Sequence, residues 1–190
     1  MSLTAVALVV VLFLLVAYLV NLYNGLVRLK HGVSKAWANI DLLLRQRHEE
    51  LPKLVETCKQ YMQHERQTLE AVISARNAVS SAREQHDIGA LGAAETGLRL
   101  GLGKLFALAE NYPELKANES FQFLQQRISG LENGIADRRE LYNEAVNLNN
   151  VRIEQFPDVL IARYFNFTAA ELLRFSDAEK ADVDIKSLFG

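Results

Sequence analysis

The segment from Leu3 to Val20 reads LTAVALVVVLFLLVAYLV, and only Thr4 and Tyr18 within it carry a polar side chain. Eighteen helical residues span about 27 Å, and continuation to Leu22 gives about 30 Å, the thickness of the hydrocarbon core of a bilayer. A helix also satisfies its own backbone hydrogen bonds, as lipid requires. We therefore predict a transmembrane helix over this segment, with the lipid bilayer as its partner.

Two other interpretations of the apolar segment are weaker. A cleaved signal peptide needs a basic region before a shorter apolar run and a cleavage site of small residues. Here only Met1 and Ser2 precede the run, and the residues from Tyr18 to Asn24 offer no pair of small side chains. A buried helix of a soluble protein is usually shorter and carries a polar stripe. We expect a span that is retained.

The flanks of the span predict its orientation. Arg28, Lys30 and Lys35 follow the span, whereas no lysine or arginine precedes it. The positive-inside rule then places the C-terminal body in the cytoplasm and the short N-terminus outside the inner (plasma) membrane. Tyr18 and Tyr23 are expected to anchor the helix at an interface. The alternative is a body on the extracytoplasmic side.

Composition limits the remaining functions. Lysine and arginine number 21 against 23 aspartate and glutamate, a net charge of −2 that argues against nucleic acid as a partner. One cysteine excludes an internal disulfide and any site built from several cysteines. Apolar residues make up 49% of the chain, which is incompatible with a disordered protein.

Beyond the span, apolar residues recur at alternating intervals of three and four, as on one face of a long helix. The positions on this face are Leu26, Leu29, Val33, Trp37, Ile40, Leu44, Leu51, Leu54, Cys58, Tyr61, Leu69, Val72, Ala75 and Val79. Pro52 predicts a kink or a very tight break, because proline removes a helical donor. Polar residues 83–87 are expected to end this helix.

The next two helices are marked by capping residues and prolines. Asp87 is a plausible N-cap for a second helix, which is expected to stop at Tyr112-Pro113. The segment from Asn118 to Ser120 predicts the start of a third helix, with a heptad rhythm that ends at Phe156-Pro157. Five glycines in the second helix (Gly89, Gly92, Gly97, Gly101 and Gly103) predict that another helix packs close to it.

The C-terminal region predicts shorter elements. A short helix is expected around Leu160 and Tyr164, and Thr168 to Glu171 fits a capping box for one or two further turns. No segment shows the alternation of a strand. We predict an all-α fold: a transmembrane anchor over residues 1–24, an antiparallel bundle of long helices over residues 25–175, and an acidic, loosely held tail over residues 176–190.

Polar side chains also fall on the apolar helix faces. They are Arg47, Glu65, Arg76, Arg138, Asn149 and Arg152. The simple interpretation is that their stems are buried while their heads reach water. The alternative is a partly buried charge network between helices.

The sequence contains only incomplete matches to motifs for metal binding, cofactor binding or nucleophilic catalysis. His48-Glu49 begins like a zinc-protease helix, but Pro52 occupies the position of the second histidine. The four histidines form no pair at helical ligand spacing, so we expect no metal and no cofactor. Cys58 lies on an apolar face and is expected to act as a small hydrophobic residue.

Several short motifs in order resemble the LemA family of bacterial membrane proteins, from about Leu3 to Phe167. They are Tyr23-Asn24-Gly25-Leu26-Val27, Ala36-Trp37, Ile40-Asp41, Leu44, Arg47, Leu51-Pro52-Lys53-Leu54-Val55, Tyr61, His64-Glu65, Ala75-Arg76, Tyr142-Asn143-x-x-Val146 and Ile153-Glu154-Gln155-Phe156-Pro157. The family often repeats Tyr-Asn seven residues after Tyr142, where this chain has Asn149-Asn150. The resemblance implies one N-terminal span and an antiparallel helical domain inside, and it carries over no catalytic residue.

Tyr23-Asn24-x-x-Val27 and Tyr142-Asn143-x-x-Val146 are the same pattern on two helices. The simple explanation is similar packing, and the alternative is a pair of related surfaces at a bundle end or a subunit contact. The candidate contact residues on helix faces are Tyr23, Asn24, Trp37, Asp41, Tyr142, Asn143, Phe156 and Pro157.

The function that the sequence favours is a non-enzymatic, single-pass membrane protein that acts as a scaffold or partner-binding platform. Heptad faces can also be satisfied between copies, so we expect a homo-oligomer and, as further partners, other membrane proteins. One alternative is a membrane-bound hydrolase that uses His64-Glu65. Another is an accessory subunit of a membrane protease.

Overall fold

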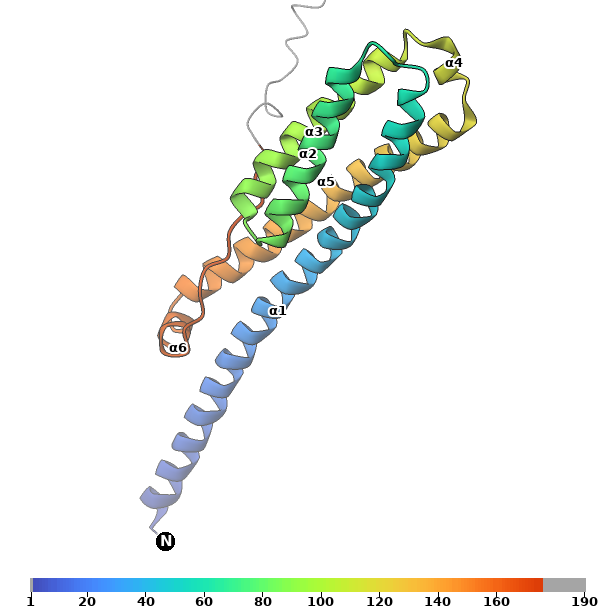
Figure 1. The fold of residues 1–190 in the computed structure, drawn as a ribbon. Coiled ribbons are helices and arrows are strands. Elements are labelled where there is room, and N and C mark those ends of the chain that lie inside the picture. Colours follow the sequence, from blue (N-terminus) through green and yellow to red (C-terminus); the bar gives the residue numbers. More distant parts are fainter. Residues whose placement is uncertain (1, 176–190) are drawn as a thin grey trace, which may run out of the picture. The chain divides into compact units, whose positions relative to one another are not determined.

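A computed structural model describes residues 2–175, and this part of the chain is helical without a strand (Figure 1). The helices are α1 (Leu3–Lys59), α2 (Arg66–Glu84), α3 (Ile88–Ala109), α4 (Pro113–Lys116), α5 (Glu119–Glu154) and α6 (Asp158–Tyr164). The predicted all-α fold is confirmed. The predicted tail from Ser176 lies outside the described residues.

The chain forms two compact units. The first unit comprises Met1–Ala38 and Glu140–Glu171, and the second comprises Asn39–Arg139 and the segment that begins at Leu172. Helices α1 and α5 therefore contribute residues to both units. Each unit has its own packing, which is described separately below.

The first part of α1 is apolar and uncovered. This 57-residue helix contains a window long and apolar enough to cross a membrane, and none of that window is buried by the described residues. Burial begins at Leu22 and continues at Leu26, which is fully buried. The predicted span is thus a candidate membrane anchor that ends where packing within the first unit starts.

A kink or a very tight break was expected at Pro52; helix α1 continues through this residue, so there is no break. The helix ends instead at Lys59, and a six-residue turn leads to α2. The prediction that one long helix extends to residues 83–87 was therefore wrong. In this turn, Asn118 Nδ2 donates to the Tyr61 hydroxyl at 3.1 Å, and the Tyr112 hydroxyl lies 3.4 Å from Glu65 Oε1. Contacts distant in sequence fix the turn, and no glycine or proline marks it.

The second unit contains α2, α3, α4 and the adjoining parts of α1 and α5, and short turns join α1 to α2 and α2 to α3. The predicted N-caps are confirmed: Asp87 Oδ1 accepts from Ala90 N at 2.8 Å, and Asn118 Oδ1 accepts from Phe121 N at 3.0 Å. Helices α2 and α3 lie side by side (Figure 1). These caps set the starts of α3 and α5 because each satisfies an otherwise unpaired helical N–H group.

The apolar faces predicted from the sequence form the core. Ile40, Leu44, Leu51, Leu54, Cys58, Leu69, Val72, Val79, Leu91, Leu98, Leu102, Leu105, Phe121, Leu124, Ile128, Leu131 and Ile135 are buried in the second unit. Burial of one such side chain contributes about 1.5–3 kcal/mol. Packing of these helix faces is therefore the main source of the unit's stability.

The segment after α6 is not helical, although Thr168 to Glu171 fits a capping box. Asn150 binds both backbone groups of Ala170: its Oδ1 accepts from Ala170 N and its Nδ2 donates to Ala170 O, each at 2.9 Å. Residues 168–175 carry no helix. The prediction of further turns was wrong because α5 supplies the hydrogen bonds that a helix would otherwise have made internally.

The glycines of α3 have different surroundings. A Cβ on Gly92 would lie 1.9 Å from the backbone oxygen of Arg174, so the non-helical C-terminal segment approaches α3 there. A Cβ on Gly101 would make an ordinary contact with Val72 of α2, whereas Gly97 and Gly103 face open space. The glycines therefore have two close neighbours: helix α2 at Gly101, as predicted, and the non-helical backbone of Arg174 at Gly92.

Candidate functional site

The most buried charges of the second unit meet at Arg47. Its guanidinium binds Glu95 of α3 through Nη2 and Glu132 of α5 through Nη1, the latter at 2.5 Å. Arg47 and Glu95 are each 1% exposed, and Glu132 is 16% exposed. Arg99 Nε lies 3.7 Å from the other oxygen of Glu132. One guanidinium therefore joins α1, α3 and α5. Of the two interpretations of polar residues on apolar faces, the charge network between helices applies to Arg47.

Burial and the neighbouring charges affect the pKa values of Glu95 and Arg47 to different degrees. Burial raises the pKa of Glu95, and the single guanidinium that it shares with Glu132 offsets this effect only in part. Burial acts to lower the pKa of Arg47, but the two carboxylates outweigh burial and raise it. Glu95 Oε2 and Arg47 Nε are buried without a hydrogen-bond partner. Arg47 is therefore charged within the cluster, and one carboxylate oxygen of Glu95 and one nitrogen of Arg47 make no hydrogen bond.

Arg76 of α2 compensates for Pro52. The N–H group that proline lacks would have bound the carbonyl of His48, four residues earlier. Arg76 Nε donates to that carbonyl at 3.0 Å, and its Nη2 lies 2.7 Å from His48 Nε2. Burial first, and then the nearby Arg76 charge, lower the pKa of His48. The imidazole is therefore neutral, with Nε2 as the acceptor.

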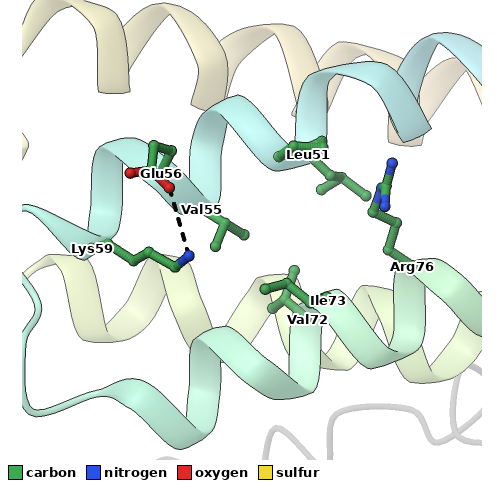
Figure 2. A pocket seen from close by; sticks show the side chains of 8 residues that line it. Leu51, Val55, Glu56, Lys59, Val72, Ile73 and Arg76 are labelled. Atoms are coloured by element: carbon green, nitrogen blue, oxygen red, sulfur yellow. Dashed lines mark ion pairs between the residues drawn. The ribbon is translucent and has the colours of Figure 1, made fainter.

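A groove of about 180 Å³ lies beside this contact, between α1 and α2 (Figure 2). Leu51 and Val55 of α1 face Val72 and Ile73 of α2 across it. The edges carry Arg76 at one end and, at the other end, the Glu56–Lys59 ion pair, whose charged atoms are 3.6 Å apart. Ligand pockets usually measure roughly 300–1,000 Å³, so this groove accommodates at most a small group.

In the first unit, side chains of α5 hold the segment from Thr168 to Glu171, which we call the strap. The Tyr142 hydroxyl donates to the carbonyl of Glu171 at 2.9 Å, and Asn149 Nδ2 lies 3.4 Å from the carbonyl of Thr168. Asn150 adds the two bonds to Ala170 described above. Burial, and then Glu171, raise the pKa of Tyr142. The asparagine pair that departs from the family pattern therefore binds backbone.

The two copies of the Tyr-Asn pattern have different surroundings. Tyr142 is buried, and its ring contacts Trp37 at a centroid distance of 5.8 Å. Tyr23 is 38% exposed, and its ring contacts Phe165 and Phe167 at 4.8 and 5.8 Å. Asn24 is exposed, whereas Asn143 is half-buried. Tyr142 fixes the strap, whereas Tyr23 belongs to an aromatic cluster with Phe165 and Phe167, which directly precede the strap.

The other candidate residues are dispersed. Asp41 pairs with Arg45 at 2.5 Å and lies 3.8 Å from Arg83, and Phe156 and Pro157 connect α5 to α6. The residues predicted to flank the membrane are all exposed: Leu3, Tyr18, Val20, Arg28, Lys30 and Lys35.

Residues considered for catalysis do not gather. His64 is exposed in the turn before α2, and Glu65 accepts from Tyr112. Cys58 is fully buried, and burial raises the pKa of its thiol to about 12. Among residues 2–175, no group of three or more histidine, cysteine or acidic side chains could hold a metal ion.

Glu95 and Glu132, the partners of Arg47, were missed by the sequence analysis. Their separations from Arg47 are 48 and 85 residues, so no local spacing could reveal the pairing. The available signal was the single acidic residue of α3, which lies among mostly apolar neighbours in the ALGAAETGLRL segment. A buried carboxylate in such a helix requires a cationic partner.

The chain resembles magnetosome proteins over about half of its length. It is 31% identical to magnetosome proteins MamQ 1 and MamQ 2 of Paramagnetospirillum magneticum over 106 residues, 54% of this chain and 39% of each relative. It is 26% identical to magnetosome protein MamQ of Magnetospirillum gryphiswaldense over 53% of this chain and 37% of that protein. The chain thus matches about two-fifths of the length of these relatives.

The family comparison covers more of the chain. The LemA family profile matches residues 36–186, a region that includes α2 to α6 and most of the packed part of α1. The resemblance seen in the short motifs is therefore confirmed. The chain belongs to the LemA family.

Proposed function

We propose that this protein is a single-pass membrane protein whose helical body is a non-enzymatic scaffold at the cytoplasmic face of the inner membrane. The observation that carries the proposal is the uncovered apolar part of α1, none of which is buried by the described residues. Exposed to water, so much apolar surface would be strongly unfavourable. Lipid removes that cost over a length that fits a bilayer.

The internal chemistry favours a scaffold over an enzyme. The buried ionisable groups of the second unit bind one another across three helices, which fixes helix register. The walls of the groove in Figure 2 are apolar. A homo-oligomer and contacts with other membrane proteins are part of the proposal, because exposed apolar residues such as Leu100 and Phe123 remain on α3 and α5.

The orientation can be tested with cysteines, because Cys58 is buried and has a thiol pKa of about 12. We expect Ser2→Cys to react with a membrane-impermeant maleimide in intact spheroplasts, and Lys104→Cys to react only after lysis. The unmodified chain is the control and should remain unlabelled. The reverse pattern would place the body outside, and recovery of the full chain in the soluble fraction would refute the anchor.

The scaffold role is tested by extraction in mild detergent followed by native mass spectrometry. We expect assemblies that contain more than one copy of the chain or a stoichiometric membrane-protein partner. A monomer without any bound protein would contradict the proposed role as a partner-binding scaffold. A hydrolase activity that Glu65→Gln abolishes, with an unchanged circular dichroism spectrum, would overturn the non-enzymatic assignment.

A further inference from the structure

The connection between α5 and the strap exposes an unusually apolar surface. Phe156 and Tyr164 are 80% and 79% exposed, and Leu160 and Phe165 are 59% and 50% exposed. Leu160 and Tyr164 are four residues apart in α6, so they share one helix face. We call Phe156, Leu160, Tyr164 and Phe165 the aromatic tip. A soluble surface rarely gathers such side chains unless they contact a partner.

The tip lies against α1 at the end of the apolar segment. Phe165 contacts Tyr23 at a centroid distance of 4.8 Å and Tyr164 at 4.9 Å, all within the first unit. Leu22, one residue before Tyr23, is already buried, whereas every residue from Val6 to Asn21 is exposed. The packed part of the unit therefore reaches the boundary at which α1 becomes uncovered.

The charge of the tip is suited to a membrane surface. Asp158 is the only acidic residue between Gln155 and Phe167. It is 3% exposed and its Oδ1 binds Arg152 Nε at 2.7 Å. Arg163 is exposed, so the surface from Phe156 to Phe165 presents apolar rings and a cation, whereas the exposed Glu154 lies two residues before Phe156, at the end of α5. Tyrosine, phenylalanine and arginine in this arrangement suit the boundary between headgroups and acyl chains of anionic lipid.

We propose that the aromatic tip is a second membrane contact, which inserts into the headgroup region of the same leaflet from which α1 emerges. This inference rests on the proposed anchor, because Tyr23 fixes the tip beside the end of the span. Its consequence is that the first unit is held to the bilayer at two places. Rotation of the body about the axis of α1 is thereby restricted, and the bilayer, rather than another protein, covers the tip.

Nitroxide labels test the depth of the tip in the full chain. Leu160→Cys and Phe156→Cys change exposed side chains, and Cys58 is too buried to compete for the label. The chain is reconstituted in vesicles of phosphatidylethanolamine and phosphatidylglycerol. Val11→Cys in the apolar segment is the control for a label within the membrane, and Lys104→Cys on α3 is the control for a label in water.

We expect both tip labels to show raised accessibility to oxygen and lowered accessibility to a water-soluble nickel complex, at about 5–10 Å into the membrane boundary. The Lys104→Cys label should show the opposite. Tip labels in water, with a Val11→Cys label deep in lipid, would overturn the inference and leave the anchor standing. If the Val11→Cys label were also in water, the proposed anchor itself would fail.

A second copy of the chain is the competing occupant of the tip. It predicts spin–spin broadening of the Leu160→Cys label that disappears when labelled chains are diluted with unlabelled ones. It also predicts low accessibility to both oxygen and nickel. That result would overturn insertion into lipid. The triple variant Phe156→Ser, Leu160→Ser and Tyr164→Cys should carry its label into water if the exposed apolar side chains drive insertion.

Discussion

Replacement of Arg47 by methionine should strongly destabilise the second unit. Methionine keeps an unbranched stem but leaves the Glu95 carboxylate, 1% exposed, without its cation. Removal of one partner from a buried ion pair costs about 3–5 kcal/mol. Glu132 suffers less, because it is 16% exposed and keeps Arg99 at 3.7 Å.

The magnitude can be worked out from the protonation of Glu95. Without Arg47, the cheapest response is for the buried carboxyl to hold a proton. This costs about 1.4 kcal/mol for each pH unit above an ordinary glutamate pKa of about 4.3. The cost is therefore about 4 kcal/mol at pH 7 and about 1 kcal/mol at pH 5. The penalty should shrink on acidification.

The sign of this pH dependence follows from linkage. Burial raises the pKa of Glu95 in the folded state, and loss of Arg47 raises it further, because the guanidinium acts to lower it. Between the unfolded and folded pKa values, the folded chain binds a proton that the unfolded chain releases. The free energy of unfolding therefore falls as the pH rises through this window.

The assay is urea unfolding of the full chain in mild detergent, followed by circular dichroism at pH 5 and pH 7. Arg45→Met is the matched control, because Arg45 lies on the same helix, is 62% exposed and pairs with Asp41, four residues earlier. Its effect should stay within about 1 kcal/mol. Arg47→Met with Glu95→Met should recover most of the stability. A single variant indistinguishable from Arg45→Met, or equally destabilised at both pH values, would refute this reasoning.

Three further outcomes are expected. Arg76→Met should lower the free energy of unfolding by about 1–3 kcal/mol. The loss should be smaller in a Pro52→Ala background, because the new N–H group of residue 52 can bind the His48 carbonyl. Additive effects of the two substitutions in a double-mutant cycle would contradict this compensation. Since the pKa of His48 is lowered from 6.5, stability should fall as the pH drops below about 6.5, and His48→Gln should flatten this part of the melting-temperature profile. Asn150→Leu should speed amide hydrogen exchange at residues 168–171, and unchanged protection there would show that the asparagine does not hold the strap.

The features that the sequence predicted correctly are those with short-range causes. The apolar segment from Leu3 is recognisable by its length alone, and the caps at Asp87 and Asn118 act on residues three positions away. The core residues follow from the three- and four-residue spacing, because a helix repeats every 3.6 residues. The family assignment likewise depends on short motifs in order.

The break that was considered at Pro52 shows where local reasoning fails. A proline ordinarily costs a helix a hydrogen bond, so a kink or break was the reasonable expectation. The actual outcome depends on Arg76, which lies 28 residues from His48 and supplies a donor to its orphaned carbonyl. The same reasoning applies to Thr168 to Glu171, whose capping-box pattern yields to hydrogen bonds from Asn150, 20 residues earlier.

The amino-acid order alone thus determined that the chain is helical, that it carries one membrane-compatible segment and which helix faces are buried. Only the tertiary structure decided the turn between α1 and α2, the non-helical strap, the carboxylate partners of Arg47 and the exposure of the aromatic tip. The physical reason is that periodicity and capping act within a few residues, whereas satisfaction of a buried charge or carbonyl depends on which distant segment lies beside it.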